Sequence, residues 1–145
     1  MRTQNAGPLK MQSSQMAVIL AFFKAISDKN RLMALLALQN RELCICQLTE
    51  ILGLAPSTVS RHMSVLKHTG IVNIRRSGKW TYYTLSKQID KRHPRLSLLI
   101  EDIFKIIRDD AETEEVIRHI EEIIQVIPIE KCGRKKGKGE RKEKK

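Results

Sequence analysis

Two cysteines one residue apart are the side chains of this sequence best suited to bind a soft ion. They are Cys44 and Cys46, in the run ELCICQL at residues 42–48. In an extended backbone, side chains two residues apart point to the same side, so the two thiolates can share one metal or metalloid ion. In a regular helix they lie about 200° apart around the axis and cannot chelate one ion. The pair straddles the predicted start of a helix, where free backbone donors and the helix dipole lower a thiol pKa.

Two other interpretations of the pair remain open. Free cysteine is often buried as a small apolar residue, so Cys44 can be structural and Cys46 incidental. The pair can also be a redox couple, although a disulfide across one residue closes a strained small ring and no thioredoxin-like βαβ pattern surrounds it.

The helix predicted from Pro56 to about His68 carries a polar and basic face opposite its apolar one. Proline is favoured at the first helical position, and Gly70 ends the helix. Hydroxyls and cations suit a helix that enters a DNA major groove, and an ordinary solvated face is the alternative. This face comprises Ser57, Ser60, Arg61, Ser64, Lys67 and His68. His62 lies between the two faces, and it either orients the helix or contacts DNA.

The elements around this helix predict a winged helix-turn-helix. The preceding helix, from about Cys46 to Leu52, is stopped by Gly53, which gives helix, tight turn, helix. After Gly70 the segments 71–76 and 79–85, separated by Ser77-Gly78, are typical of a β-hairpin. We expect Trp80, Tyr82 and Tyr83 to form the hairpin core. The basic hairpin tip, expected to contact phosphate, consists of Arg75, Arg76 and Lys79.

Four further helices are predicted from apolar residues at helical spacing. The first two are lined by Val18, Ile19, Phe22, Phe23 and Ile26, and by Leu32, Leu35, Leu36 and Leu38. The two beyond Pro94 are lined by Leu98, Leu99, Ile103, Phe104 and Ile107, and by Val116, Ile117, Ile120, Ile123, Ile124 and Ile127. Ser27 and Asp28 are expected to start the second helix. The wide apolar stripes of the first and last helices predict an isologous homodimer.

Length and charge are consistent with a nucleic-acid-binding domain. The chain has 145 residues and a net charge of +11, which favours an anionic partner. We expect a flexible arm at residues 1–12, a winged helix-turn-helix domain at 13–128 and a basic disordered tail at 129–145. The odd number of cysteines predicts a cytoplasmic protein with reduced thiols, and no segment is long enough to span a membrane. The sequence has no Gly-rich phosphate loop, so we expect no enzyme and no organic cofactor.

The whole pattern resembles the ArsR/SmtB family of metal-sensing repressors, and most of all its arsenic-responsive members. The resemblance covers about residues 20–85, through FKAISDKNRLMALLAL, ELCICQL, LGLAPSTVSRHMSVLKHTGIV and RRSGKWTYYTL. It implies that Cys44 and Cys46 bind As(III) or Sb(III). It also implies that the helix predicted from Pro56 to about His68, the reader helix, contacts an inverted-repeat operator. The residues that match the family's DNA-reading segment are Ser57, Thr58, Ser60, Arg61 and His62.

The sequence departs from this pattern at the third ligand. Some arsenic sensors carry a third cysteine where this chain has Thr49. Cys132 is then a candidate third thiolate, and a free tail thiol is the alternative. The zinc-ligand pattern of the family's zinc sensors is incomplete in this chain. His119 and Glu122 match one pair of its ligands, but the other pair of ligands is missing. We expect ligand binding to pull residues 44–46 into an extended form, unwind the first helical turn and lower DNA affinity. The alternative inducers are Cd, Pb or thiol oxidation.

Overall fold

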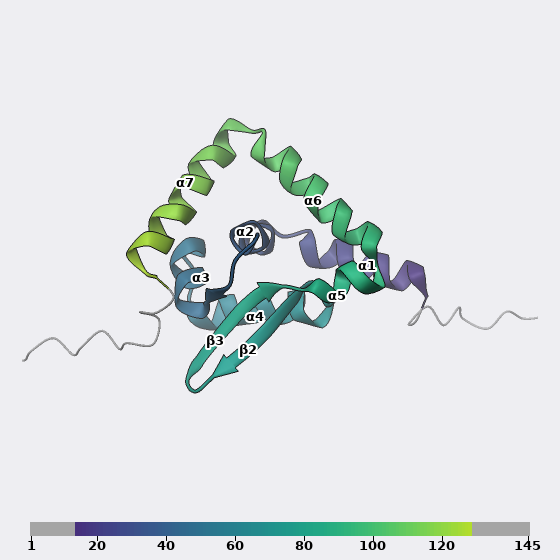
Figure 1. Ribbon diagram of the computed structural model, residues 1–145, viewed down its shortest axis with the longest axis horizontal. Helices are drawn as coiled ribbons and strands as arrows, with labels where there is room; N and C mark the ends of the chain where they lie inside the picture. Colours follow the sequence, from purple (N-terminus) through teal and green to yellow (C-terminus); the bar gives the residue numbers. More distant parts are fainter. Residues whose placement is uncertain (1–13, 129–145) are drawn as a thin grey trace, which may run out of the picture.

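The computed structural model describes residues 14–128 as a mainly helical domain with one small antiparallel sheet (Figure 1). In chain order the elements are α1 (Gln15–Ile26), α2 (Lys29–Ala37), β1 (Leu43–Cys44), α3 (Ile45–Leu52), α4 (Pro56–His68), β2 (Val72–Ser77), β3 (Trp80–Leu85), α5 (Lys87–Arg92), α6 (Pro94–Arg108) and α7 (Ala111–Val126). This confirms the predicted fold class. The predicted arm at 1–12, the tail at 129–145 and Cys132 lie outside the described residues.

The helices begin and end where their sequence signals predict. The Asp28 carboxylate caps α2 by accepting a hydrogen bond from the Arg31 backbone N–H at 3.0 Å, which satisfies one of the free donors of a helix start. Gly53 ends α3 in the left-handed conformation, with φ +62°, which costs a glycine no steric strain. Pro56 is the first residue of α4. The turn between α3 and α4 is therefore fixed by local chemistry.

The core lies between α2, α3, α4 and the inner face of the sheet, and α6 and α7 close it. Its largest fully buried apolar side chains are Phe104, Leu35, Leu38, Leu43, Leu48, Met63, Leu66, Ile71, Val59 and Val72. One predicted core residue is wrong, because Leu98 is 59% exposed while Ile100 of the same helix is buried. The two residues are separated by more than half a turn of helix. Helix α6 therefore packs through Ile100 and Phe104.

The sheet differs from the predicted hairpin in two ways. Its strand order is β1-β3-β2, so the dipeptide Leu43–Cys44 adds a third strand that the sequence did not predict. The hairpin turn is shifted by one residue, because Ser77 pairs with Trp80 and the loop is Gly78 and Lys79. Gly78 has a φ of +58°, which a two-residue hairpin loop requires. The short helix α5 was also not predicted.

Helices α6 and α7 form an arch over α2, and the hairpin projects from the opposite side of the molecule (Figure 1). The arch brings the C-terminal end of α7 beside α3, the helix that follows the first cysteine. Among residues 14–128 no helix has the length and apolar character needed to cross a membrane.

Candidate nucleic-acid interface and thiol site

Cys44 and Cys46 are brought together at the junction of β1 and α3. Cys44 is the N-cap of α3, in extended backbone with φ −88° and ψ 163°, and Cys46 lies in the first turn. The Cα atoms are 5.4 Å apart and the two sulfur atoms are joined in a disulfide. Cys44 is fully buried and Cys46 half-buried. The sulfurs meet with the first turn of α3 intact, because Cys44 is already outside the helix; the expected unwinding of that turn on ligand binding stays a prediction.

Gln47 connects this junction to the far end of the chain. Its side chain is buried, with 1% exposure. The Oε1 atom accepts a hydrogen bond from the Cys44 backbone N–H at 3.0 Å. The Nε2 atom donates to the Ile127 backbone carbonyl at 2.7 Å. One amide therefore holds both the cap of α3 and the end of α7.

A second contact joins the same two regions. The Arg41 guanidinium donates to a Glu121 carboxylate oxygen at 2.6 Å, and both side chains are partly exposed. This hydrogen bond lowers the pKa of the Glu121 carboxyl below its ordinary value. Helix α7 is thus held at two places, by Arg41 just before β1 and by Gln47 in the first turn of α3.

The thiol site shares a sheet with the hairpin. Cys44 pairs with Tyr82 on β3, and Tyr82 pairs with Arg75 on β2. Directly paired residues of antiparallel strands project from the same face. Arg75 lies over the Tyr82 ring, 4.3 Å from its centroid. The Arg75 guanidinium also makes a two-pronged contact with the Glu42 carboxylate, at 2.6 and 3.1 Å, which raises the pKa of the Arg75 guanidinium.

The face of α4 predicted to read DNA is open to solvent. The predicted polar stripe is exposed along its whole length: Ser57, Ser60, Arg61, Ser64, Lys67 and His68. Thr58 is half-buried, and Val59, Met63 and Leu66 pack into the core. An exposed helix with hydroxyls and cations has the size and chemistry to lie in a major groove, whose width is about 12 Å.

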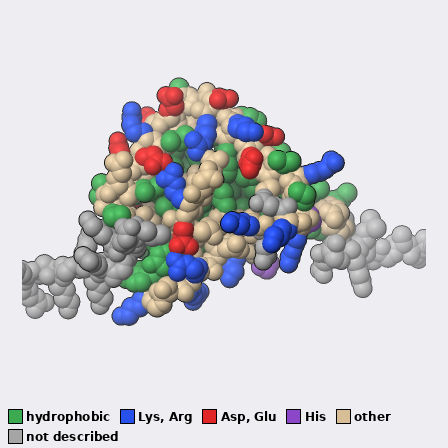
Figure 2. All heavy atoms as spheres, in the orientation of Figure 1, with side chains coloured by type: hydrophobic (Ala, Val, Ile, Leu, Met, Phe, Trp, Pro, Cys, Tyr) green, Lys and Arg blue, Asp and Glu red, His purple; other side chains and the backbone are tan. Residues whose placement is uncertain are grey.

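The predicted cations of the hairpin are divided between its tip and its stem. Lys79 lies in the turn, Arg76 in the adjacent part of β2, and both are exposed. Arg75 lies further along the stem and is engaged with Glu42. Figure 2 shows mostly Lys and Arg side chains on the lower part of the molecule, around the hairpin, and most Asp and Glu on the upper arch. This separation of charge suits a polyanion bound on the hairpin side.

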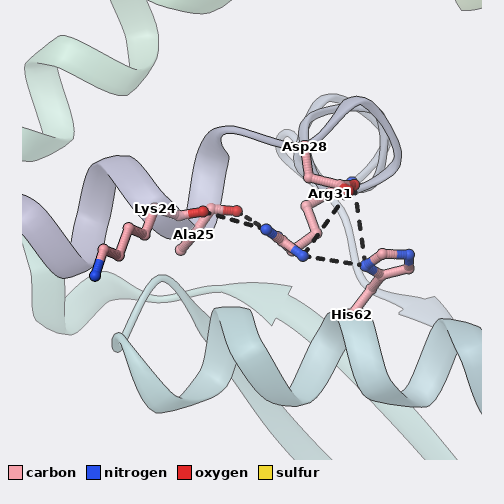
Figure 3. A network of polar contacts seen from close by, with 5 residues as sticks. All are labelled: Lys24, Ala25, Asp28, Arg31 and His62. Atoms are coloured by element: carbon pink, nitrogen blue, oxygen red, sulfur yellow. Dashed lines mark hydrogen bonds and ion pairs between the residues drawn. The ribbon is translucent and has the colours of Figure 1, made fainter.

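His62 is held by the start of α2 (Figure 3). Its Nδ1 atom lies 3.3 Å from the Arg31 guanidinium and 3.9 Å from the Asp28 carboxylate. Because arginine can only donate, this contact is a hydrogen bond in the tautomer whose Nδ1 accepts and whose proton is on Nε2. Arg31 also donates to the backbone carbonyls of Lys24 and Ala25. His62 and Arg31 therefore tie α4 to α1 and α2.

A buried tyrosine links α4 to the hairpin. Tyr83 of β3 is 3% exposed. Burial raises the pKa of its phenol, and a hydrogen bond with Ser60 opposes this effect. Helix α4 and the sheet are thus connected through this side-chain pair. Of the three predicted hairpin-core residues only Tyr83 belongs to the core, because Trp80 and Tyr82 are half-buried.

A third thiolate would have to come from beyond residues 14–128. Within this range no group of three or more His, Cys, Asp or Glu side chains is placed to hold a metal ion. Thr49, at the position of the third cysteine, donates its hydroxyl to the Ile45 carbonyl at 2.7 Å. His119 and Glu122 are both exposed on α7. Once the disulfide is reduced, the two adjacent thiolates would be a soft donor pair that fits a thiol-seeking ion.

Sequence reasoning singled out the cysteine pair and the exposed face of α4, but it missed three residues that hold the surrounding elements together. Glu42 and Gln47 flank the cysteine pair, and Arg31 follows the cap of α2. The capping-box spacing of Cys44 and Gln47 was the only available signal for Gln47. The ion pair of Glu42 could not be predicted, because its partner is 33 residues away.

Comparison with known proteins places the chain among transcriptional regulators. The model of the family described as "Bacterial regulatory protein, arsR family" matches residues 28–73. An arsenic resistance transcriptional regulator of Pseudomonas putida is 36% identical over 88 residues, which is 60% of this chain and 63% of that relative. An HTH-type transcriptional regulator of Methanocaldococcus jannaschii is 34% identical over 56% of this chain and 89% of its own length. The cadmium resistance regulator CadC of Listeria innocua is 35% identical over 54% of this chain and 67% of its length.

Solved structures give the same fold. HlyU of Vibrio cholerae superposes with a TM-score of 0.56 at 28% identity and covers 65% of this chain and 96% of its own. A homodimeric winged helix-turn-helix DNA-binding domain of Mycobacterium bovis, titled a possible ArsR-family regulator, gives a TM-score of 0.52 at 25% identity and covers 67% and 90%. These two structures confirm the winged helix-turn-helix fold.

Proposed function

The chain belongs to the ArsR family of bacterial regulatory proteins, and from this we propose that it is a repressor released from duplex operator DNA when As(III) or Sb(III) binds Cys44 and Cys46. The observation that carries the proposal is the contact between the two sulfur atoms at the start of α3, the first helix of the helix-turn-helix. Relatives named as arsenic and cadmium resistance regulators support a thiol-seeking inducer.

Helix α4 is the proposed reader of the operator. Its exposed Ser57, Ser60 and Arg61 can reach base edges, and the tip cations Arg76 and Lys79 can contact phosphate. His62 has one ring nitrogen occupied by Arg31, so only its Nε2–H can serve a DNA acceptor. A pseudo-palindromic operator follows if two copies bind with two-fold symmetry.

We place the dimer contact on α1. Its exposed apolar side chains are Met16, Ile19, Leu20 and Phe23, and an isologous partner would bury them. The homodimeric relative of known structure supports this assembly. The stripe of α7 is less available, because Ile120 is buried in the protomer's own core. A substitution of Ile120 would therefore test folding rather than dimerisation.

The ligand site would be built from the reduced thiols of Cys44 and Cys46, which supply soft thiolate donors. Cys132 is our proposed third ligand, from the same chain. The side-chain amide of Gln47 bridges the backbones of Cys44 and Ile127. The five residues from Ile127 to Cys132 can extend about 17 Å. Closing this short loop has a small entropic cost compared with a contact across the full sequence separation.

A second candidate function is a response to oxidants, which the disulfide between Cys44 and Cys46 favours. A peroxide would oxidise one thiol to a sulfenic acid and release water. The second thiol would then displace a second water molecule and form the disulfide. Both functions use the same pair, and they differ in what releases the DNA.

The test is a titration of the reduced protein on an inverted-repeat duplex that the protein itself has selected in vitro, with fluorescence anisotropy as readout. We expect release by As(III) and Sb(III) at lower concentrations than by Cd(II), Zn(II) or peroxide. Cys44→Ser and Cys46→Ser should bind the duplex normally and lose the response. Release by peroxide alone would establish the second candidate instead, and no duplex binding would reject both.

X-ray absorption of the As(III) complex tests the third ligand. The wild-type protein should show three sulfur neighbours and Cys132→Ser two. Equal counts in the two proteins would remove Cys132 from the site.

A further inference from the structure

Gln47 is one of only two polar side chains that are buried among those the structure describes. A buried amide is costly unless its donor and its acceptor are both paired. Gln47 meets this condition with two backbone groups far apart in the sequence, the Cys44 N–H and the Ile127 carbonyl. Gln47 is the third residue of α3, where a side chain reaches back to the helix cap. It could not make two such hydrogen bonds within α3 without a different side-chain geometry.

We infer that Gln47 is a positioning residue of the thiol site, which fixes the backbone of Cys44 and holds the end of α7 beside the cysteine pair. The inference rests on the proposed function and adds a role that the sequence resemblance does not supply. Gln47 touches no ligand in this scheme. It acts by fixing the backbone of Cys44 and by joining it to Ile127 at the end of α7.

The rest of α7 is arranged to serve the same contact. The ion pair between Arg41 and Glu121 anchors the helix about one and a half turns before its end. Arg41 itself stands three residues before Cys44. The apolar residues Ile117, Ile120 and Ile124 pack the intervening face against the core. Helix α7 is thus held along its length, and Gln47 makes the last contact before the chain leaves the described region.

This arrangement predicts that the C-terminal helix and the thiols act as one unit. If Gln47 loses both hydrogen bonds, the final turn of α7 should open without unfolding the domain, because the Arg41–Glu121 contact remains. The backbone of Cys44 would then lose the hydrogen bond that fixes it at the cap of α3, and with it the fixed position of the Cys44 thiol. An ordinary core residue would instead lower the stability of the whole domain uniformly.

The experiment compares the full-length wild type with Gln47→Met, which keeps the length and burial of the side chain but removes both hydrogen bonds. Gln125→Met is the matched control, because Gln125 is an exposed glutamine of α7. Amide hydrogen exchange of the reduced, ligand-free proteins is measured first. We expect the amides of the last turn of α7 to exchange about tenfold faster in Gln47→Met, as for one buried hydrogen bond lost. Amides of the α4 core should be unchanged.

Binding of As(III) is measured next, by competition with a dithiol chelator. We expect about tenfold weaker binding by Gln47→Met and wild-type binding by Gln125→Met. Unchanged exchange at the end of α7 would overturn the tether itself. Faster exchange with unchanged As(III) affinity would overturn its positioning role.

The two proposals fail separately. If the wild type binds no As(III), the proposed function fails and the exchange experiment still decides the tether. If Gln47→Met does not fold, Gln47→Asn replaces it, since one methylene less prevents the amide from reaching both backbone groups. Wild-type exchange in Gln47→Asn would then overturn the inference.

Discussion

Substituting Glu42 with glutamine should strengthen DNA binding. In the structure the Glu42 carboxylate holds Arg75 by two hydrogen bonds, at 2.6 and 3.1 Å. A carboxylate and a DNA phosphate compete for the same guanidinium, and Glu42→Gln removes the protein's competitor. The prediction rests on the proposed DNA binding and asks which cations of the hairpin are available for it.

The expected gain is small, and its size follows from exposure. The side chains of Arg75 and Glu42 are 55% and 30% exposed, and solvent and salt weaken an ion pair that is this exposed. Freeing Arg75 should therefore tighten operator binding by at most about fivefold. The salt dependence is a sharper measure. One additional phosphate contact should steepen the slope of log K against log salt concentration by about 0.9.

The assay is an anisotropy titration of operator duplex at several salt concentrations. Glu50→Gln is the control, because Glu50 is an exposed carboxylate of α3 and its substitution changes the net charge equally. If Glu42→Gln and Glu50→Gln have the same slope, Arg75 does not bind phosphate and the competition argument is refuted. A steeper slope in both would indicate a general charge effect instead.

Three further pairs of variants test the reader helix, the dimer and the helix cap. Arg61→Ala should weaken operator binding more than non-specific binding. Arg76→Ala should weaken both alike and flatten the slope of log K against log salt concentration by about 0.9. An unchanged operator preference in Arg61→Ala would mean that α4 does not read the bases. Leu20→Asp should give folded monomers in sedimentation, with little operator affinity, because Leu20 is 49% exposed in the protomer. Ala21→Asp, on another side of α1, should remain dimeric. A dimer in both variants would move the interface away from this face. Asp28→Ala should lose a helix cap, about 1 kcal/mol. Asp28→Asn should keep the cap and lose only the charge. The folded-state pKa of the Asp28 carboxyl is lowered from its ordinary 3.8, chiefly by the hydrogen bond from the Arg31 backbone N–H. The charge therefore stabilises the fold above pH 3.8, and this stabilisation disappears as the pH falls through the lowered pKa. Urea unfolding at pH 7 and pH 3 measures both effects, and equal losses at the two pH values in Asp28→Asn would contradict the pKa argument.

Local signals in the sequence predicted most of the helices. Asp28, Gly53 and Pro56 each act through their own backbone or a neighbouring one, and each does in the structure what its type favours. Strand β1 and helix α5 were missed for the opposite reason. A two-residue strand carries no periodicity, and Leu43–Cys44 is a strand only because β3 is beside it. The hairpin turn was misplaced by one residue because Ser77-Gly78 and Gly78-Lys79 are both acceptable turn sequences.

The candidate site was predictable in its parts but not in its connections. Spacing identified the thiols, and it placed Arg61 and Ser57 on an exposed face, which the structure agrees with. No sequence rule brings Gln47 to Ile127, a separation of 80 residues. Such contacts depend on how α6 and α7 fold back over α2, and that arrangement is decided by packing of the whole core.

The sheet offers a route from the thiols to DNA that leaves α3 intact. Cys44 is joined by the β1–β3 ladder to Tyr82, and Tyr82 lies under Arg75, whose partner Glu42 precedes Cys44 by two residues. A ligand bound between the reduced thiols of Cys44 and Cys46 would act on β1, and a displacement of β1 would move Glu42 and the paired strand β3. Because Arg75 contacts both Glu42 and Tyr82 of β3, it would carry this displacement to the hairpin. We therefore expect Arg75→Ala to reduce the difference in DNA affinity between the free and the As(III)-bound protein, while Arg76→Ala should lower both affinities and leave their ratio unchanged. An unchanged ratio in Arg75→Ala would mean that the signal reaches the DNA through α3 and α4 instead.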